Sequence, residues 1–324
     1  MLASEWYELL CSDHAGYLAA RQEHFAQEDA PRPRLNRLRF QGLDLSGLDL
    51  KLMDFSHCEF YACNLEGADL TDTLLRLCRV RNCVLRGARL IGVNMARGEA
   101  IQCDFSGADL SAASLLLEKL YGSEFTGARL ANADFSAAEA PEVSFREIDA
   151  ERCFWHKADL RNCDFSGARM GRNVMRTAAL SGAHLSGVDL HEADLTWTVL
   201  HNTDLSGANL SGANLSNCFL QDTDMSGADL TRARMEVVDF DQVDLAGARI
   251  EGLLVDHVET TEDRQQHAQL KATALEQFEL LQLNQNGDSQ NGESGEPALG
   301  QFMQPGDPTA AGVPDKDGPE GQQT

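Results

Sequence analysis

The chain of 324 residues is long enough for one large domain or two ordinary ones, and its hydrophobic content of 43% is enough for a sizeable core. No run of about 18 apolar residues is present, which argues against a membrane-spanning helix. The formal net charge of −24 argues against general binding of nucleic acid through its phosphates, whereas it suits basic partners or imitation of a polyanion.

The first segment, residues 1–32, is predicted to form a helical cap. Within residues 2–28 the apolar residues recur at near-helical spacing, and they are Leu2, Trp6, Leu9, Leu10, Tyr17, Leu18 and Phe25. The opening stretch MLASEWYELL has neither the basic segment nor the long apolar segment of a secretory signal. We therefore expect a cytoplasmic bacterial protein, although export without a classical signal would leave no such mark.

Residues 33–257 follow a five-residue rule without interruption. Of the 45 positions divisible by five from Leu35 to Val255, 42 hold a large apolar residue; we call these the central positions. The exceptions are Ala100, Ala140 and Ala150. The position two residues earlier, here called the small position, is Ala at 17 sites and Cys at eight, and it is charged only at Glu118.

A period of five fits neither a helix nor a flat strand. Sites five apart spread around the surface of a helix, and they alternate between the two faces of a strand. A chain that turns a corner every five residues instead places the central and small positions inside a square coil of 20 residues, and successive coils stack about 4.8 Å apart. Turn-tolerant Gly, Asn, Asp and Ser then lie at the corners. The rule predicts about 11 coils and a rod of about 50 Å.

Blocks such as SGADL, SGANL, EGADL and TGARL match the motif A(D/N)LXX. In these residues the chain resembles the pentapeptide-repeat protein family. The resemblance implies an all-β solenoid, namely a right-handed quadrilateral parallel β-helix, and we expect flanking α-helices at both of its ends. Because members of the family differ in function, the motif is specific for the fold alone.

The last part of the chain is predicted to contain a C-terminal helix at residues 258–284 and a disordered, acidic, Gly/Pro-rich tail at residues 285–324. The helix would start near the capping sequence TTED. Its apolar face would consist of Leu270, Ala274, Phe278 and Leu281. Since both ends of such a rod expose coil edges, we expect the terminal helices to cover them. The alternative for the C-terminal helix is a homodimer contact.

No grouping in the sequence predicts catalysis or a cofactor. Eight of the nine Cys occupy the small position, which favours packing over a metal or redox role, because a straight ladder of thiols about 4.8 Å apart does not surround a metal tetrahedrally. No two His lie 20 residues apart, and no glycine-rich phosphate-binding motif is present. We predict no enzyme, no catalytic or metal-binding residue and no cofactor.

The five-residue rule breaks around Glu118. Its stacked neighbours one coil away are Gly98 and Ala138, and the next central residue, Leu120, lies between alanines. Burial of an unpaired carboxylate costs several kcal/mol. We therefore expect a local bulge that turns Glu118 outward; the alternative is a carboxylate that is paired inside.

Around this break the outward side chains are a candidate surface for a partner, although the pattern favours chance exposure of unrelated side chains. Tyr and Arg, which are typical interface anchors, occur in the outward column of this side, next to apolar residues. The candidate residues are Tyr61, Arg81, Ile101, Leu116, Leu117, Glu118 and Tyr121. A basic group is expected one or two coils away, and it consists of Arg76, Arg79, Arg81, Arg86, Arg89 and Arg97.

Two functions from different classes follow. The first, which we favour, is a non-enzymatic scaffold or regulator that presents rigid solenoid faces to a protein partner. The alternative comes from a resemblance to quinolone-resistance pentapeptide proteins: a DNA mimic that binds DNA gyrase or topoisomerase IV, with a homodimer through the C-terminal helix. The 23 basic residues against 33 acidic ones in residues 31–256 weaken the alternative. We expect neither nucleic acid nor a membrane as a direct partner.

Overall fold

The computed structural model describes residues 1–27, 30–240 and 242–255, which belong to a unit that spans Met1–Val258. The predicted C-terminal helix and the acidic tail lie outside the described residues. No helix in the described part of the chain is long and apolar enough to cross a membrane.

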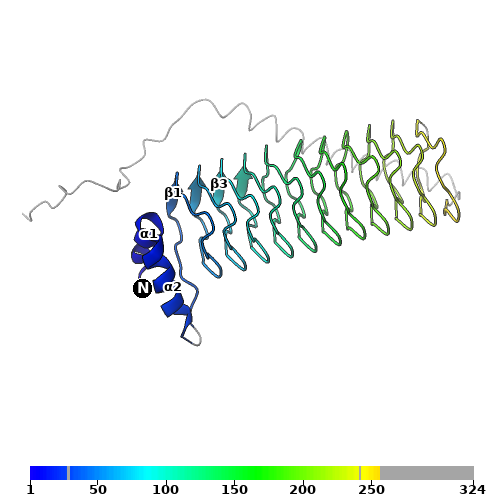
Figure 1. Cartoon of the computed structure of the whole chain (residues 1–324). Helices are drawn as coiled ribbons and strands as arrows, with labels where there is room; N and C mark the ends of the chain where they lie inside the picture. The colour runs from blue at the N-terminus through cyan, green and yellow to red at the C-terminus, as the bar shows by residue number, and fades with distance from the viewer. Residues whose placement is uncertain (28–29, 241, 256–324) are drawn as a thin grey trace, which may run out of the picture. The chain divides into compact units, whose positions relative to one another are not determined.

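The repeats form a right-handed quadrilateral β-helix, which confirms the predicted fold class. Each coil takes 20 residues, so that Asn64 pairs in parallel with Asp44 in the coil before and with Val84 in the coil after. The amide of Leu45 donates to the carbonyl of Asn64 at 2.7 Å, and the amide of Asn64 donates to the carbonyl of Leu43 at 2.8 Å. Hydrogen bonds of this kind recur along the rod and stack the coils in line (Figure 1).

One side of the rod carries four short strands. They are β1 (Arg39–Gln41), β2 (Glu59–Tyr61), β3 (Arg79–Arg81) and β4 (Glu99–Ile101), and they form a parallel sheet in the order β1-β2-β3-β4 (Figure 1). Elsewhere in the described coils the pairing consists of isolated bridges, because a five-residue block leaves little straight chain between two corners. We call this side, including its continuation at residues 119–121 and 139–141, the strand side.

The core is a narrow column inside the coils. Every central residue from Leu35 to Met235 is buried. Aromatic rings at central positions of one side stack from coil to coil, with centroid distances of 4.7 Å for Phe105–Phe125 and 5.1 Å for Phe125–Phe145. Since a fully buried Leu or Phe side chain contributes about 1.5–3 kcal/mol, these central residues are a major source of the stability of the rod.

The corners share one backbone conformation. At every fifth position from Arg37 to Gly252, two residues after each central residue, φ lies between 52° and 75°. Many corners are closed by a turn hydrogen bond such as that from the Ala68 amide to the Leu65 carbonyl, at 3.0 Å. Positive φ costs glycine nothing, but it is unfavourable for residues with a Cβ atom. The type of residue at each corner is therefore informative.

The N-terminal segment forms two helices, α1 (Ala3–Ser12) and α2 (His14–Phe25). The apolar spacing over residues 2–28 had suggested one helical stretch, and the break between the two helices lies at Asp13. The side chain of Asp13 accepts a hydrogen bond from the amide of Gly16 at 2.9 Å and so caps the start of α2.

These helices pack on the first coils. Trp6, Leu10 and Tyr17 are buried and belong to the same hydrophobic cluster as the rod core. The hydroxyl of Tyr17 donates to the carbonyl of Asp49 at 2.8 Å, and Arg21 forms an ion pair with the Asp49 carboxylate at 2.9 Å. The exposed coil edge expected at this end is therefore covered.

At the other end, the last described coils are progressively less buried. Phe240 and Leu245 are partly buried, whereas Ile250 and Val255 are exposed although they occupy central positions. The C-terminal helix predicted to cover this end belongs to the part of the chain that the structure does not describe, so its capping or dimerising role stays a prediction.

Candidate protein-binding surface

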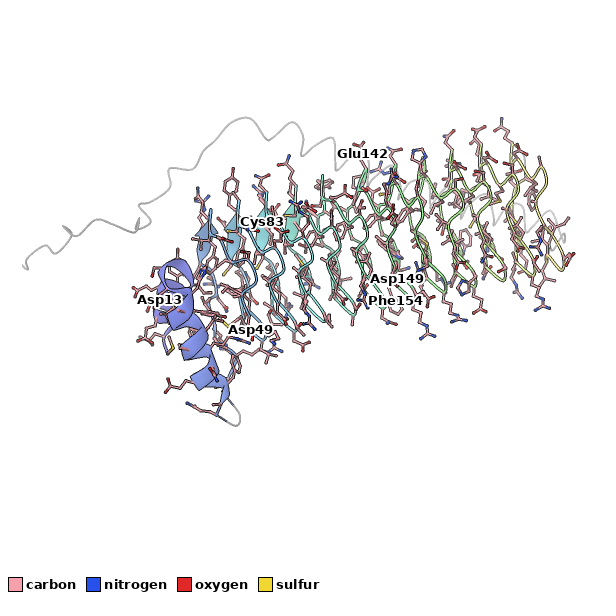
Figure 2. All side chains as sticks on the ribbon, viewed as in Figure 1. Asp13, Asp49, Cys83, Glu142, Asp149 and Phe154 are labelled. Atoms are coloured by element: carbon pink, nitrogen blue, oxygen red, sulfur yellow. The ribbon has the colours of Figure 1, made fainter. Side chains whose placement is uncertain are left out.

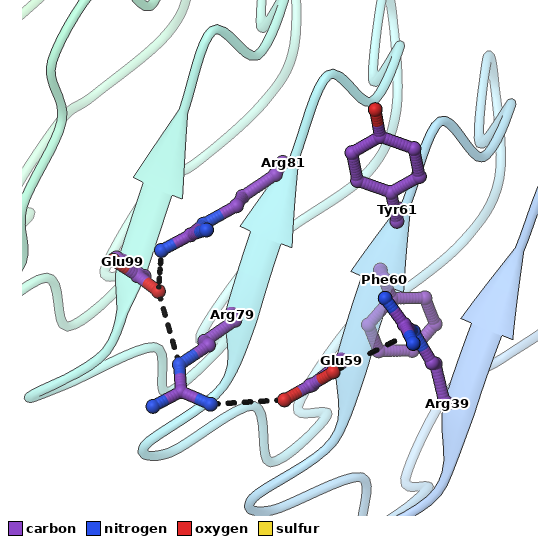
Figure 3. A pocket seen from close by; sticks show the side chains of 7 residues that line it. All are labelled: Arg39, Glu59, Phe60, Tyr61, Arg79, Arg81 and Glu99. Carbon is purple, nitrogen blue, oxygen red and sulfur yellow. Dashed lines mark hydrogen bonds and ion pairs between the residues drawn. The ribbon is translucent and has the colours of Figure 1, made fainter. Parts of the chain in front are cut away.

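Charges alternate in sign along the strand side. The outward residue before the central position is, in successive coils, Arg39, Glu59, Arg79, Glu99, Lys119 and Glu139. Arg79 forms ion pairs with Glu59 at 2.9 Å and with Glu99 at 3.2 Å, and Arg39 lies 3.6 Å from Glu59 (Figure 3). Because residues 20 apart stack directly, the alternation in sequence becomes a ladder of ion pairs in space.

A shallow pocket with a volume of about 370 Å³ lies over this ladder (Figure 3). Its lining consists of Arg39, Glu59, Phe60, Tyr61, Arg79, Arg81 and Glu99. Small-molecule sites are lined mainly by apolar side chains with a few polar groups. Here the lining is mostly charged, and the charges already pair with one another, as in the contact of Arg81 with Glu99 at 2.7 Å. The pocket therefore does not favour a small-molecule ligand.

Four of the seven predicted patch residues stack in one column of the strand side, and they are Tyr61, Arg81, Ile101 and Tyr121. Tyr61 is 41% exposed, whereas Ile101 and Tyr121 are partly buried. The hydroxyl of Tyr121 donates to the carboxylate of Glu139, so Tyr121 is held in place by the ladder. The predicted column exists, but Arg81 and Tyr121 already have partners within the rod.

Leu116 and Leu117 lie on the corner that leads into the strand side. Leu117 is 46% exposed with φ at 57°, and Leu116 is partly buried. Two coils earlier, Leu77 occupies the same corner, is 43% exposed and has the same φ. Leu77 is not among the residues predicted from the sequence, although it lies 40 residues, or two whole coils, before Leu117, and this spacing is the signal for it.

The prediction that a bulge turns Glu118 outward is wrong. Glu118 is 1% exposed, and its carboxyl group accepts a hydrogen bond from the amide of Gly98 at 2.7 Å. The coil keeps its regular turn, since the Glu118 amide donates to the Leu115 carbonyl at 3.1 Å, and Lys119 stays paired with its neighbours 20 residues away. Glu118 is therefore a core residue and not part of an exposed patch.

Two features make this burial possible. Gly98 has no side chain, and a Cβ atom there would lie 3.2 Å from Glu118 Oε1, so the glycine leaves the space that the carboxyl group fills. Burial raises the pKa of Glu118 to about 9, while the bond from Gly98 acts in the opposite direction. At neutral pH the group is protonated, so no buried charge has to be balanced.

The corner that carries Leu77 and Leu117 differs from the rest of the surface. We define the basic edge as the two outward residues that follow the central residue, at positions 36–196 and 37–197 in steps of 20. Its 18 positions contain no Asp or Glu. Its basic and large apolar residues are Arg37, His57, Arg76, Leu77, Arg97, Leu116, Leu117, His156, Lys157, Arg176 and Trp197.

Within the part of the chain that the structure describes, the arginines in the N-terminal half of this edge have no carboxylate within 4.0 Å. Arg37, Arg76 and Arg97 are exposed, and among the residues that the structure describes none of them forms an ion pair. Farther along, Arg176 lies 3.9 Å from Asp194. Side chains project outward along the whole length of the described coils (Figure 2).

The basic group expected around residues 76–97 is not a single cluster. Arg79 and Arg81 belong to the ladder of the strand side, Arg86 pairs with Asp104 at 3.0 Å, and Arg89 lies 4.0 Å from Asp69. Neighbouring blocks of sequence face different sides of the square, so nearness in sequence does not bring their outward residues together. Of the six Arg residues, two lie on the basic edge: Arg76 and Arg97.

The eight Cys residues at small positions are buried, and their thiols donate hydrogen bonds to backbone carbonyls inside the rod. The Cys58 thiol donates to the carbonyl of Leu35 at 2.7 Å, 23 residues earlier, and Ser123 makes the same bond to Ala100 at 2.7 Å. Burial raises the pKa of Cys58 to about 12, so its thiol stays protonated. In the described residues no group of three or more His, Cys, Asp or Glu side chains is arranged to hold a metal ion.

Comparison with known families gives a direct result. The model for pentapeptide repeats matches the chain in eight copies, over residues 34–76, 63–99, 102–139, 142–172, 176–207 and 208–247. The chain belongs to the pentapeptide-repeat family. A comparison with curated proteins gave no match.

Several solved structures resemble this pentapeptide-repeat protein. HetL from the cyanobacterium Nostoc sp. strain PCC 7120, involved in the regulation of heterocyst differentiation, is 21% identical; the match covers 74% of this chain and 94% of HetL, with a TM-score of 0.40. Full-length QnrB1, a plasmid-mediated fluoroquinolone resistance protein, is 18% identical over 69% of this chain and 94% of QnrB1, with a TM-score of 0.31. These likenesses concern the fold alone.

Proposed function

We propose that this pentapeptide-repeat protein is a non-enzymatic interaction protein of the bacterial cytoplasm whose rod presents a fixed surface to a protein partner. The observation that carries the proposal is the pair of exposed leucines, Leu77 and Leu117, at positive φ on the basic edge. A non-glycine residue in this conformation costs about 1–2 kcal/mol. Both leucines keep nearly half of their surface exposed in a fixed backbone conformation, which suits an apolar contact with a partner.

The rod holds these side chains in fixed places. The amide of Leu77 donates to the Ala96 carbonyl at 3.2 Å, and that of Leu117 donates to the Ser136 carbonyl at 3.0 Å, so each corner is tied to the next coil. Anchors that are ordered before binding lose little conformational entropy when the complex forms. A rigid repeat structure therefore suits recognition of a partner by several aligned side chains.

The charge pattern favours this function over the alternative of a DNA mimic that binds DNA gyrase or topoisomerase IV. Such a mimic needs a continuous acidic surface, but Asp109 and Asp149 each lie beside an Arg of the next coil, at 3.9 and 2.6 Å. The longest unbroken run of acids in an outward column before the central position comprises Asp204, Asp224 and Asp244, in the last coils. A supercoiling assay with excess protein tests the alternative, and inhibition or protection of gyrase would support it.

Site-specific cross-linking in cells of the source organism tests the proposed function. A photo-reactive phenylalanine analogue replaces Leu117 in the full chain, and a matched control carries it at Glu147, which lies at an equivalent exposed corner with φ at 56°. We expect a discrete cross-linked protein from position 117 that is missing from position 147. Identical products from both positions, or none from either, would contradict the proposal.

A further inference from the structure

Two of the four corners of the rod adopt the same positive φ with different types of residue. We define the glycine edge as positions 47–207 in steps of 20, where eight of nine residues are glycine and the other is Glu147. The corresponding positions of the basic edge, 37–197, contain no glycine. Large side chains, including Arg97 and Trp197, instead adopt the left-handed conformation there, with φ at 64° and 63°.

The basic edge is also the centre of a cationic strip in an acidic protein. The strip consists of four outward columns in steps of 20 residues, which start at residues 34, 36, 37 and 39 and end by residue 119. They hold seven cations and three carboxylates, a net charge of +4 in a chain of −24. The cations are Arg34, Arg37, Arg39, Arg76, Arg79, Arg97 and Lys119. The carboxylates are Asp54, Glu59 and Glu99, and each of them has an Arg within 4.0 Å.

We infer that the basic edge between Arg37 and Leu117 binds an acidic amphipathic α-helix of a partner protein. The inference rests on the proposed function and names the class of partner. The exposed Arg37, Arg76 and Arg97 are available to carboxylates, and Leu77 and Leu117 on the same edge are available to the apolar face of the helix. Complementary charge then sets orientation and the rate of encounter, while the leucines supply the desolvated contact.

The spacing of the coils favours a helix over an extended peptide. Successive coils offer one anchor position about every 4.8 Å. A helix that lies along the edge offers side chains on one face about every 5.4 Å, whereas an extended chain offers them about every 6.6 Å. Arg37 and Leu117 are four coil steps apart, or about 19 Å. Over this length the side chains of a helix fall out of register with the coils by about 2.4 Å, and those of an extended chain by about 7 Å. About 13 helical residues cover this length.

The same strip is poorly suited to nucleic acid. A phosphate backbone has no counterpart for the exposed Leu77 and Leu117, and the chain as a whole carries −24. An acidic amphipathic helix has both carboxylates for the arginines and apolar side chains for the leucines. Binding to DNA is the competing outcome, and a DNA competitor distinguishes it from binding of the helix.

The test measures binding of a designed peptide to the full-length protein by fluorescence anisotropy. The probe is a helix of about 18 residues with Glu and Leu on one face, and its controls are a Lys-for-Glu peptide and a scrambled peptide of the same composition. We expect micromolar binding of the acidic amphipathic helix, weakened as salt rises from about 50 to 200 mM, and binding at least tenfold weaker for both control peptides. Equal binding of the scrambled peptide would overturn the register argument and with it the inference.

Two double variants locate the site. Arg76→Glu with Arg97→Glu reverses the charge on the basic edge, while Arg152→Glu with Arg172→Glu makes the same change of net charge on another corner, where both residues are exposed at φ of 59°. We expect a loss of about tenfold or more for the first pair and less than about twofold for the second. Equal losses would mean that net charge alone acts, and they would overturn the inference.

A third variant and a competitor complete the design. Leu77→Asn with Leu117→Asn removes both apolar side chains and introduces a residue that tolerates positive φ. This variant should bind the peptide about fivefold more weakly or worse. A DNA duplex of about 20 base pairs should not compete. If the duplex displaces the peptide and binds more weakly to the Arg76→Glu, Arg97→Glu variant, the edge is a nucleic-acid site instead. A cross-link at Leu117 without peptide binding would leave the proposed function standing and refute the acidic helix.

Discussion

On the glycine edge, Gly107 and Gly127 hold φ at 65° and 67°, and a Cβ atom added at either would meet nothing within 4 Å. On the basic edge, Leu77 and Leu117 hold φ at 57° with side chains that are nearly half exposed. Both edges have the same backbone, so the architecture itself asks only for a residue that tolerates the turn. The side chains on the basic edge are an addition that the fold does not need.

The contrast continues inside the rod. Behind the glycine edge the small position is mostly alanine, as at Ala88, Ala108 and Ala128. Behind the basic edge the corresponding column runs through Cys78, Gly98 and Glu118. The regular edge has a regular interior, and the irregular edge lies over buried polar groups. The charged small position, Glu118, and the exposed Leu77 and Leu117 therefore occur at the same corner, which is where we place the function.

The largest expected effect distinguishes a crowded glycine from an open one. In Gly98→Ala the new Cβ would lie 2.5 Å from the Cys78 carbonyl oxygen, so the free energy of unfolding should fall by about 3 kcal/mol. Gly107→Ala on the glycine edge meets nothing within 4 Å and should cost about 1 kcal/mol through its positive φ alone. Urea denaturation of both variants measures the difference. Equal losses would mean that the interior behind the basic edge is no tighter than elsewhere.

The buried Glu118 should make stability fall as pH rises. In the unfolded chain the group loses its proton near 4.5, whereas burial in the folded rod raises its pKa to about 9. Between these values the unfolded state binds fewer protons, so the free energy of unfolding decreases with pH and levels off above about 9. From pH 4.5 to pH 7 this titration lowers the free energy of unfolding by about 3 kcal/mol.

Glu118→Gln removes this titration while it keeps an oxygen that can accept the Gly98 amide. The variant should be more stable than the parent at about pH 8 and nearly equal to it at about pH 5, as measured by denaturant midpoints. The control Glu142→Gln, at an exposed corner, should change neither value. A parent whose stability follows the same pH profile as the Glu118→Gln variant would show that the Glu118 carboxyl group is not buried in its neutral form.

Sequence alone was sufficient for the architecture because every coil obeys the same packing rule. Apolar residues from Leu35 to Met235 had to point inward in a coil of 20 residues, and they do. The fate of Glu118 was predicted wrongly, since the cost of a buried charge was counted without protonation and without the space that Gly98 leaves. The protonation of Glu118 and the space for its carboxyl group both depend on atoms of the adjacent coil.

The candidate surface was predicted only in part, for a related reason. Tyr61 and Tyr121 were assigned to one column correctly, but the ladder that engages Tyr121 with Glu139 becomes visible only when side-chain contacts are known. The basic edge was missed because its residues come from different coils, 20 positions apart. Aligning the sequence in rows of 20 brings Leu77 and Leu117 into one column, and such an alignment would have found the edge.

Exchanging the two edges gives the next effect in size. Gly67→Leu with Gly107→Leu places large side chains at positive φ on the glycine edge, and it should lower the free energy of unfolding by about 2 kcal/mol in total. The reverse exchange, Leu77→Gly with Leu117→Gly, relieves strain but adds chain entropy, so stability should change by less than about 1 kcal/mol. Urea denaturation and peptide binding are measured on both pairs. A large loss of stability in the Leu→Gly pair would mean that these leucines serve the fold.

The smallest expected effect is a difference in stability between variants of Arg79, which forms ion pairs, and of Arg76, which lies three residues earlier. Arg79 contacts Glu59 and Glu99, whereas Arg76 forms no ion pair with any residue that the structure describes. Exposed ion pairs contribute about 0.2–1 kcal/mol, so Arg79→Gln should cost at most about 1 kcal/mol at low salt and less at high salt. Arg76→Gln should leave stability unchanged and should weaken peptide binding. If Arg76→Gln is as destabilising as Arg79→Gln, Arg76 has a carboxylate partner within the chain, and the basic edge is not open to an acidic helix.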